Sequence, residues 1–350
     1  MKKELIFSSL LAVMIAVIGL SKFAFKKDIK ETKGVDVVPT MEDVITNDSS
    51  WCPTFQLIFN DLKNDIVKQD IKFDKSNTFL DNLNKEEFKE SDISSDYYYK
   101  TYGVKSIELK NKIIKGIKDK FNQKSDILDK FDFTNSSPNN YFFYSMLYRE
   151  FKYPKKFNKL ANGKFNDKYD NIKYFGIKDT DEELAKQIKV LYYNNEDDFA
   201  IKLLTTSNDE VIINKNPKGN NFREIYNNIT SKSKGYKDNE FTTESDYFKM
   251  PYLSLNVMKE YKELEGQPIK DSEGNLIEIG TALQTIKFTL DDVGGKIKSE
   301  AGMNVVKSSI EDNKSKRYFY VDKTFAIFLK ETSKDKPYFA ARVNDIRKFQ

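Results

Sequence analysis

Three apolar stretches near the C-terminal end of the chain predict β-strands. They are residues 283–290, 319–329 and 337–343. In the first, Ile286, Phe288 and Leu290 share one face, which is the period-two pattern of a half-buried strand. The second is apolar at its odd-numbered positions, with one lysine as the exception. Between the first two strands, an acidic break with two glycines at residues 291–295 leads into a long polar loop that ends near Arg317.

Four stretches are predicted as helices. Three of them carry hydrophobic residues three or four positions apart, and the other is rich in aromatic residues. The predicted helices are 55–66, 107–131, 141–151 and 221–229. In the second, Ile113, Ile114, Ile117 and Phe121 are predicted to face inward. The lysines opposite them are interpreted as a solvated face, with a role at a membrane surface as the alternative. Three short strands are predicted at 189–193, 199–204 and 210–214.

The composition limits the partners of the chain. Its 350 residues are 39% hydrophobic, enough for one large domain or two small ones. Its 58 basic and 54 acidic residues are interspersed and give a net charge of +4, so nothing indicates nucleic-acid binding. The heavy use of Lys, Asn, Asp and Ile is typical of an AT-rich bacterial genome.

The chain has no histidine and a single cysteine. Ser-His-Asp and Cys-His catalysis, histidine-ligated metals and internal disulfides are therefore excluded within one chain. Cys52 is interpreted as a small buried residue, with a lone reactive thiol as the alternative. The acidic groups at 180–183 and 196–198 lack the spacing of a calcium loop and are interpreted as solvated turns. We expect no metal, no cofactor and no enzymatic activity. A carboxylate- or lysine-based enzyme is the remaining enzymatic alternative.

The N-terminal residues have the pattern of an export signal. Two lysines precede an apolar run at residues 5–20. Residues 1–25 are predicted to be a signal peptide or an N-terminal membrane anchor, with a buried helix as the alternative. Residues 26–50 are polar and are interpreted as a linker, followed by a single domain at 51–350. We therefore expect a protein that is extracellular or at the cell surface and that touches a membrane only through its N-terminal segment.

Three C-terminal motifs occur in order and with suitable spacing. They are residues 289–295, 320–328 and 338–343. Together they resemble the C-terminal end of the serpins, the serine protease inhibitor family, with Thr324 and Ala341 where that family has Pro and Gly. The strands and short helix after residue 188 are also similar to serpins, and residues 248–255 followed by 257–264 resemble a serpin strand followed by a helix. The resemblance implies a divergent bacterial member with an α+β fold of mixed and antiparallel sheets, a set of helices and an exposed reactive loop near the C-terminus.

In serpins a protease cuts the reactive loop, whose first half then inserts as a new central strand of a sheet. Such a segment needs small or apolar residues at alternate positions, because burying an unpaired charge costs several kcal/mol. The odd-numbered residues from 295 to 305 meet this condition, and the pattern breaks at Lys307. The predicted hinge residues are Asp292, Gly294, Gly295, Ile297, Ser299 and Ala301. The predicted cleavage site is Lys307–Ser308, and the further candidates are Lys314, Lys316 and Arg317.

The predicted function is inhibition of a serine or cysteine protease by a secreted or membrane-anchored monomer. The first alternative is a non-inhibitory surface protein of the same fold, because Ile297 and its flanking lysines depart from the small-residue hinge of inhibitory serpins. The second is an unrelated extracytoplasmic α+β binding protein, because the core between Cys52 and Asp292 is shorter than is usual for serpins.

Overall fold

The computed structural model describes residues 30–73, 77–134, 140–296 and 316–350. The chain divides into two compact units, Met1–Lys30 and Glu31–Gln350, and the fold described below is that of the second. The prediction for residues 1–25 lies outside the described residues. No helix in the described ranges is both long enough and apolar enough to cross a membrane.

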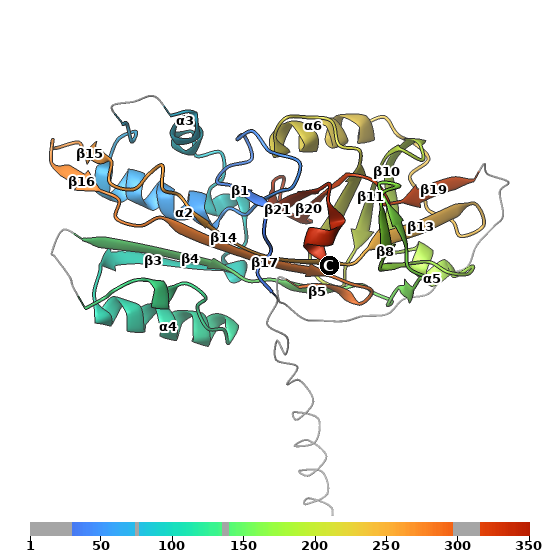
Figure 1. Ribbon diagram of the computed structural model, residues 1–350, viewed down its shortest axis with the longest axis horizontal. Coiled ribbons are helices and arrows are strands. Elements are labelled where there is room, and N and C mark those ends of the chain that lie inside the picture. The colour runs from blue at the N-terminus through green and yellow to red at the C-terminus, as the bar shows by residue number, and fades with distance from the viewer. Residues whose placement is uncertain (1–29, 74–76, 135–139, 297–315) are drawn as a thin grey trace, which may run out of the picture. The chain divides into compact units, whose positions relative to one another are not determined.

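A seven-stranded sheet carries much of the hydrophobic core (Figure 1). Its order is β1–β2–β21–β20–β12–β11–β10, and every neighbouring pair is antiparallel except β1 and β2. The strands are β1 (Asp36–Val38), β2 (Ser49–Trp51), β10 (Ile188–Asn195), β11 (Asp198–Leu204), β12 (Asp209–Lys215), β20 (Phe325–Glu331) and β21 (Pro337–Val343). The predicted strands that fall in this sheet after residue 188 are confirmed.

The burial of this sheet explains why its strands are almost continuously apolar. Every residue of β12 is buried. Helix α6 (Phe222–Ser233) places Phe222 and Tyr226 against the ring of Phe328 in β20. Asn221 caps this helix by accepting a hydrogen bond from the Glu224 N–H at 2.8 Å. The predicted helix at 221–229 is confirmed and continues for one more turn.

The domain begins earlier than the sequence predicts. The predicted linker at 26–50 is wrong for residues 36–50, because β1 and β2 belong to the central sheet. The hydrophobic residues buried with them are Val37, Val38, Met41 and Ile45. Strands of three residues are too short to show a hydrophobic period, so the polar composition of this segment dominates its appearance in the sequence.

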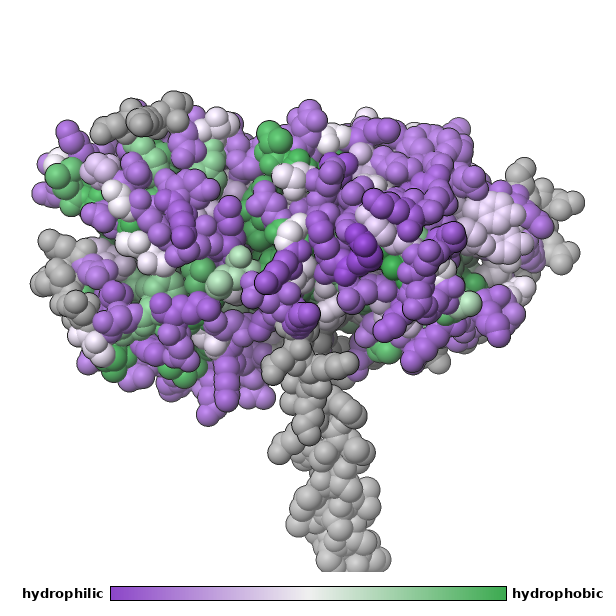
Figure 2. Space-filling model, in the orientation of Figure 1, coloured by the Kyte–Doolittle hydropathy of each residue, from purple (hydrophilic) through white to green (hydrophobic). Residues whose placement is uncertain are grey.

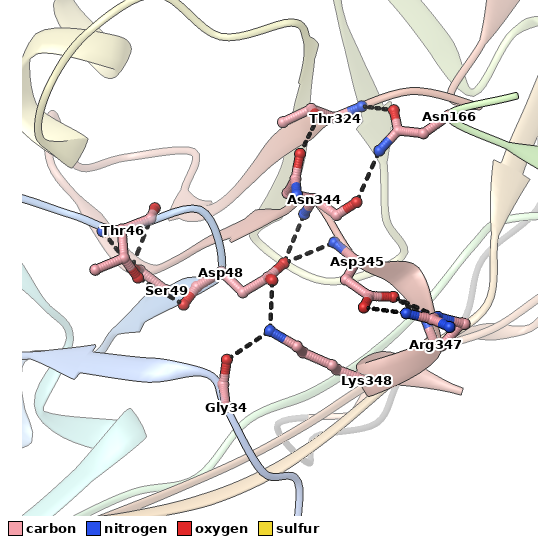
Figure 3. A network of polar contacts seen from close by, with 10 residues as sticks. All are labelled: Gly34, Thr46, Asp48, Ser49, Asn166, Thr324, Asn344, Asp345, Arg347 and Lys348. Carbon is pink, nitrogen blue, oxygen red and sulfur yellow. Dashed lines mark hydrogen bonds and ion pairs between the residues drawn. The ribbon is translucent and has the colours of Figure 1, made fainter. Parts of the chain in front are cut away.

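A network of polar contacts ties this first segment to the C-terminus (Figure 3). The Asp48 carboxylate accepts hydrogen bonds from the backbone N–H groups of Asn344 and Asp345 at 2.7 and 2.9 Å. It also pairs with Lys348 Nζ at 2.8 Å. Because Asp48 is buried, these three donors replace the water that its charge would otherwise need. The start and the end of the domain therefore stabilise each other.

Two four-stranded sheets and three two-stranded sheets make up the rest of the strands in the described ranges. The four-stranded sheets have the orders β19–β13–β9–β6 and β14–β17–β18–β5. Their strands are β5 (Glu150–Lys152), β6 (Asn158–Lys159), β9 (Tyr174–Gly176), β13 (Asp246–Pro251), β14 (Leu253–Glu260), β17 (Leu283–Leu290), β18 (Gly294–Lys296) and β19 (Arg317–Tyr320). The two-stranded sheets are β3 (Tyr98–Val104) with β4 (Tyr141–Leu147), β7 (Gly163–Phe165) with β8 (Tyr169–Ile172), and β15 (Pro268–Lys270) with β16 (Leu276–Glu278).

The C-terminal strand predictions are confirmed with one change. The strand predicted at 283–290 is β17, and its even-numbered residues are buried. The strand predicted at 319–329 is divided, because residues 321–324 form a turn between β19 and β20, which belong to different sheets. Lys323, the one exception to the apolar pattern, lies in this turn and pairs with Asp197 at 2.9 Å.

The predicted helix at 141–151 is wrong, because this segment forms β4 and β5. β4 pairs antiparallel with β3 along its full length, and Phe142 and Tyr144 are buried while Tyr141 is exposed. Aromatic side chains suit a pleated, half-buried surface, so the partner strand decides between helix and strand here. The helix expected at 257–264 is also wrong, because its first half continues β14.

Helices α2 (Thr54–Asp61) and α4 (Ile107–Phe121) both pack against β4. Helix α2 also contacts β17. α4 buries Leu109, Ile113 and Ile117 in one cluster with side chains of β4. Ile114 is 43% exposed, so the prediction that it faces inward is wrong. The remaining helices in the described ranges are α3 (Thr78–Asn84), α5 (Glu182–Ala185) and a π-helical continuation of α2 at Leu62–Val67. Short 3-10 helices also occur at Glu90–Asp92, Ser95–Tyr97, Leu128–Lys130 and Ile346–Phe349.

Candidate hinge and strand-insertion site

A tight turn joins β17 to β18 and fixes the start of the hinge. The Asp291 Oδ1 atom accepts hydrogen bonds from the backbone N–H groups of Val293 at 2.8 Å and Gly294 at 3.1 Å. The Asp291 N–H donates to the Gly294 carbonyl at 2.8 Å. This side-chain turn directs the chain back along β17, where Leu290 pairs with Gly295.

The buried carboxylate of Asp292 attaches this turn to two other segments. The Tyr252 hydroxyl donates to Oδ1 at 2.8 Å, and Lys156 Nζ lies 3.0 Å from Oδ2. The Asp292 carbonyl accepts a hydrogen bond from the Phe157 N–H at 2.8 Å. Burial alone raises the pKa of Asp292, but Lys156 and Tyr252 outweigh it, so the pKa lies below its ordinary value. The carboxylate is therefore charged at neutral pH and holds the turn in place.

Two glycines let β18 lie close against β5. β18 is antiparallel to both of its neighbours, β17 and β5. A Cβ atom at Gly294 would lie 2.2 Å from the Phe151 carbonyl oxygen, and one at Gly295 would lie 2.2 Å from the Phe151 ring. No side chain fits at either position unless the strand or its neighbour moves. Because the Phe151 ring is buried in the core, the odd-numbered face of β18 points toward the core.

Beyond the hinge, two strand edges have no partner within the described residues. Of the described strands, β14 pairs with one edge of β17, and only β18 pairs with the other, at Thr289 and Leu290. β4 leads into β5, and β3 is its one partner among the described strands. Helix α2 contacts both β4 and β17, so the two strands lie against the same helix (Figure 1).

The pairing of β18 gives the distance between its two neighbours at the hinge. β18 lies between β17 and β5, so these two strands are separated by two strand spacings, about 10 Å. Beyond the hinge, no described strand pairs with these edges of β17 and β4. At the hinge itself, β17 and β5 stand far enough apart to hold one strand, and β18 occupies that position.

The chain re-enters the described residues at β19, where Arg317 is firmly anchored. Its guanidinium donates to both carboxylate oxygens of Asp246 at 2.8 and 2.7 Å. It also donates to Asp238 and to the carbonyl of Glu240. Arg317 is 6% exposed, so its prediction as a cleavage candidate is wrong, because a protease must hold the residue before the cut in its own pocket. Lys316 is exposed.

The predicted site residues fall into two groups. Three hinge residues come together in the turn and β18, beside β5. They are Asp292, Gly294 and Gly295. Apart from Lys316 and Arg317, the other predicted residues lie outside the described residues. They are Ile297, Ser299, Ala301, Lys307, Ser308 and Lys314.

The sequence did not identify the residues that hold the hinge. Lys156, Tyr252 and Phe151 belong to none of the three C-terminal motifs and lie far from Asp292 along the chain. The one available signal is Asp292 itself, because a carboxylate at the end of a buried strand needs a cation or hydrogen-bond donors. That need does not say which residues supply them.

The described residues offer little for other chemistry. Within them, no three His, Cys, Asp or Glu side chains lie close enough together to hold a metal ion. Cys52 is buried, and burial raises the pKa of its thiol to about 11. The thiol is therefore protonated at neutral pH and lacks the thiolate that nucleophilic reactivity needs.

Of the comparisons with known proteins, the one with solved structures shows a likeness. No protein-family profile and no curated protein matches the chain. Maspin matches over 85% of this chain and 92% of its own, at 13% identity and a TM-score of 0.52. Serpin48, a highly specific serpin of the insect Tenebrio molitor, matches over 72% of this chain and 78% of its own, at 13% identity and a TM-score of 0.42. Identity this low is informative about the fold alone, and the comparison with maspin, at a TM-score of 0.52, supports a likeness of fold. The chain therefore has a serpin-like α+β fold, which confirms the predicted fold class.

Proposed function

We propose that the chain is a serpin-like inhibitor of a serine or cysteine protease, which it traps by loop cleavage and strand insertion. The observation that supports this most is the position of β18. Its three residues pair between β17 and β5, next to two strand edges that have no other partner among the described residues. A cut in the segment after Lys296 would free that segment to continue β18 along both edges.

The sequence after β18 fits such an extension. The odd-numbered face of β18 points toward the core at Gly295. With a period of two, the next inward residues of an inserted strand would be uncharged. They are Ile297, Ser299, Ala301, Met303 and Val305. Insertion along this face would therefore bury no unpaired charge.

The inward side chains decide whether insertion is favourable. Each inserted residue would gain two backbone hydrogen bonds of about 1 kcal/mol each and lose about 1–2 kcal/mol of backbone entropy. These contributions nearly cancel. Burial of Ile297, Met303 and Val305 would add about 2 kcal/mol each, so the inserted state should be favoured by several kcal/mol.

The proposal includes the place where the protein acts. The lysines and apolar run in residues 1–25 support export. We infer that the domain is released outside the cell or held at its surface by this segment, where it meets its protease as a monomer without a cofactor.

Incubation of the full chain with trypsin or papain tests the proposal. The expected product is a complex of chain and protease that survives SDS. Ala301→Arg would place a charge on the inward face and should leave only cleaved chain, whereas Glu300→Arg on the opposite face should still form the complex. Cleaved chain as the sole product of the wild type with both proteases would refute inhibition.

A non-inhibitory binding protein of the same fold is the second candidate. The observation that favours it is the bulky Ile297 beside Lys296 and Lys298, at the point where insertion would begin. Slow insertion would let the protease finish hydrolysis and leave. In that case the cleaved chain would be stabilised but no complex would form.

A further inference from the structure

Helix α4 and its flanking residues carry an excess of positive charge. Residues 105–124 contain seven lysines and two acidic residues. Three of the lysines have partners on the protein, among them Lys110, which pairs with Asp129 at 2.9 Å. The Nζ atoms of the other four make no hydrogen bond or ion pair within the described part of the chain. These four are Lys105, Lys112, Lys118 and Lys124.

Two isoleucines lie among these lysines with much of their surface exposed. Ile107 and Ile114 are each 43% exposed. Seven residues apart, they share one side of the helix, and the exposed Asn111 lies between them. Of the eight large hydrophobic side chains that are exposed in the described ranges, four belong to α4 or to the strand ends beside it. They are Val104, Ile107, Ile114 and Tyr141.

Figure 2 shows this mixture on the surface. Hydrophobic residues lie among hydrophilic ones at the lower left, over α4 and the neighbouring strands. The hydrophobic side of α4 itself is already buried against β4 through Leu109, Ile113 and Ile117. The exposed isoleucines are therefore additional to those that the fold requires.

We propose that the side of α4 formed by Ile107, Asn111, Ile114 and Lys118, here called the α4 face, docks on the surface of a membrane that contains anionic lipids. The lysines would meet the headgroups, and the isoleucines would enter the boundary between headgroups and acyl chains. Lysine side chains suit this position because their apolar stems can lie along the acyl boundary while the ammonium group stays in water.

The isoleucines favour a membrane over a soluble polyanion. A soluble polyanion would neutralise the lysines but would leave Ile107 and Ile114 in water. A bilayer interface satisfies both kinds of side chain at once, and α4 is long enough, about 22 Å, to lie along it. This inference does not depend on protease inhibition.

A fluorescent probe on the α4 face tests the proposal in the full chain. Asn111→Cys can be labelled with an environment-sensitive nitrobenzoxadiazole group, because Cys52 is buried and its thiol is protonated at neutral pH. A label at Asn227→Cys on the exposed side of α6 is the matched control. The probe reports its own surroundings, so contacts that the N-terminal segment makes with lipid do not produce its signal.

The expected result is a blue shift and a rise in emission at position 111, but not at position 227, on vesicles of phosphatidylcholine with phosphatidylglycerol. Vesicles of phosphatidylcholine alone should give little change. Lys118→Gln should weaken the partition of the label by roughly fivefold, since each lysine near an anionic surface contributes about a factor of five. Ile107→Ser with Ile114→Ser should weaken it by roughly 10- to 80-fold, because burial of the exposed 43% of each isoleucine is lost.

Three results would overturn the proposal. One is an equal shift at both labelled positions. Another is no shift at position 111 on anionic vesicles. The last is a shift that the isoleucine variant leaves unchanged and that soluble polyphosphate reproduces, which would make the α4 face a site for a soluble polyanion instead. Melting curves of the lysine and isoleucine variants check that both are folded.

Discussion

Replacing Gly294 by alanine should detach β18 from β5. An alanine Cβ atom would lie 2.2 Å from the Phe151 carbonyl oxygen and 2.7 Å from Lys152 Cα, and both are backbone atoms that cannot rotate away. An ordinary contact begins near 3.4 Å, so β18 must move by more than 1 Å. A shift of that size breaks the hydrogen bonds between the paired residues of the two strands.

The loss of two or three backbone hydrogen bonds should cost about 2–3 kcal/mol. For a domain of this size the melting temperature should fall by about 3–5 °C. Gly280→Ala is the matched control, because a Cβ atom there meets nothing within 4 Å. Both substitutions reduce the conformational entropy of the unfolded chain by the same amount. Melting curves of the two variants therefore isolate the contact with β5. Equal melting temperatures would refute the close seating of β18 and the hinge derived from it.

Two further predictions concern the anchors on either side of the loop. The pKa of Asp292 lies below its ordinary value of 3.8, so its ion pair with Lys156 contributes stability above about pH 4 and loses it as the pH falls through the folded-state pKa. The melting temperatures of wild type and Asp292→Asn should therefore differ at neutral pH and converge below about pH 4. A constant difference would contradict the ion pair. Arg317→Lys should lower the free energy of unfolding by about 3 kcal/mol. The buried carboxylate of Asp246 would then face one ammonium group instead of a guanidinium that donates to both of its oxygens. Arg347→Lys, at a side chain that is 61% exposed, should cost less than about 1 kcal/mol, and equal melting of the two arginine variants would contradict the anchoring role.

The sequence predicts some elements of this fold well because their signals lie in residues that are close together in the chain. β17 is buried on one face only, so its even-numbered residues reproduce the period of a strand, and its bounds agree with the prediction. The short helix after Asn221 follows a residue type that is favoured at the N-cap position, so its start can be predicted from the sequence. Neither element needs knowledge of a distant partner.

Other elements depend on partners that the sequence does not reveal. Residues 141–151 are rich in aromatic side chains that suit a buried helix or a strand equally well. The pairing of β4 with β3 decides the outcome, and β3 lies well before it in the chain. The strands β1 and β2 are too short for any periodic pattern, so the start of the domain also depends on the sheet they join.

The candidate site shows the same division. Asp292 and the two glycines follow from the C-terminal motifs, because a turn after a strand has a local signature. The cation and hydroxyl that hold Asp292 come from Lys156 and Tyr252, which no spacing rule connects to it. The burial of Arg317 likewise follows from Asp246, which lies on a different strand.

The most direct test compares the thermal unfolding of the full chain before and after a single protease cut. The cut lies between Lys296, at the end of β18, and Lys316, and mass spectrometry locates it. If the freed segment becomes a strand between β17 and β4, the cut protein should melt about 10 °C or more above the intact one, since several kcal/mol of new pairing and burial would accompany the break. A cut protein that melts at the same temperature as the intact protein, or below it, would contradict strand insertion.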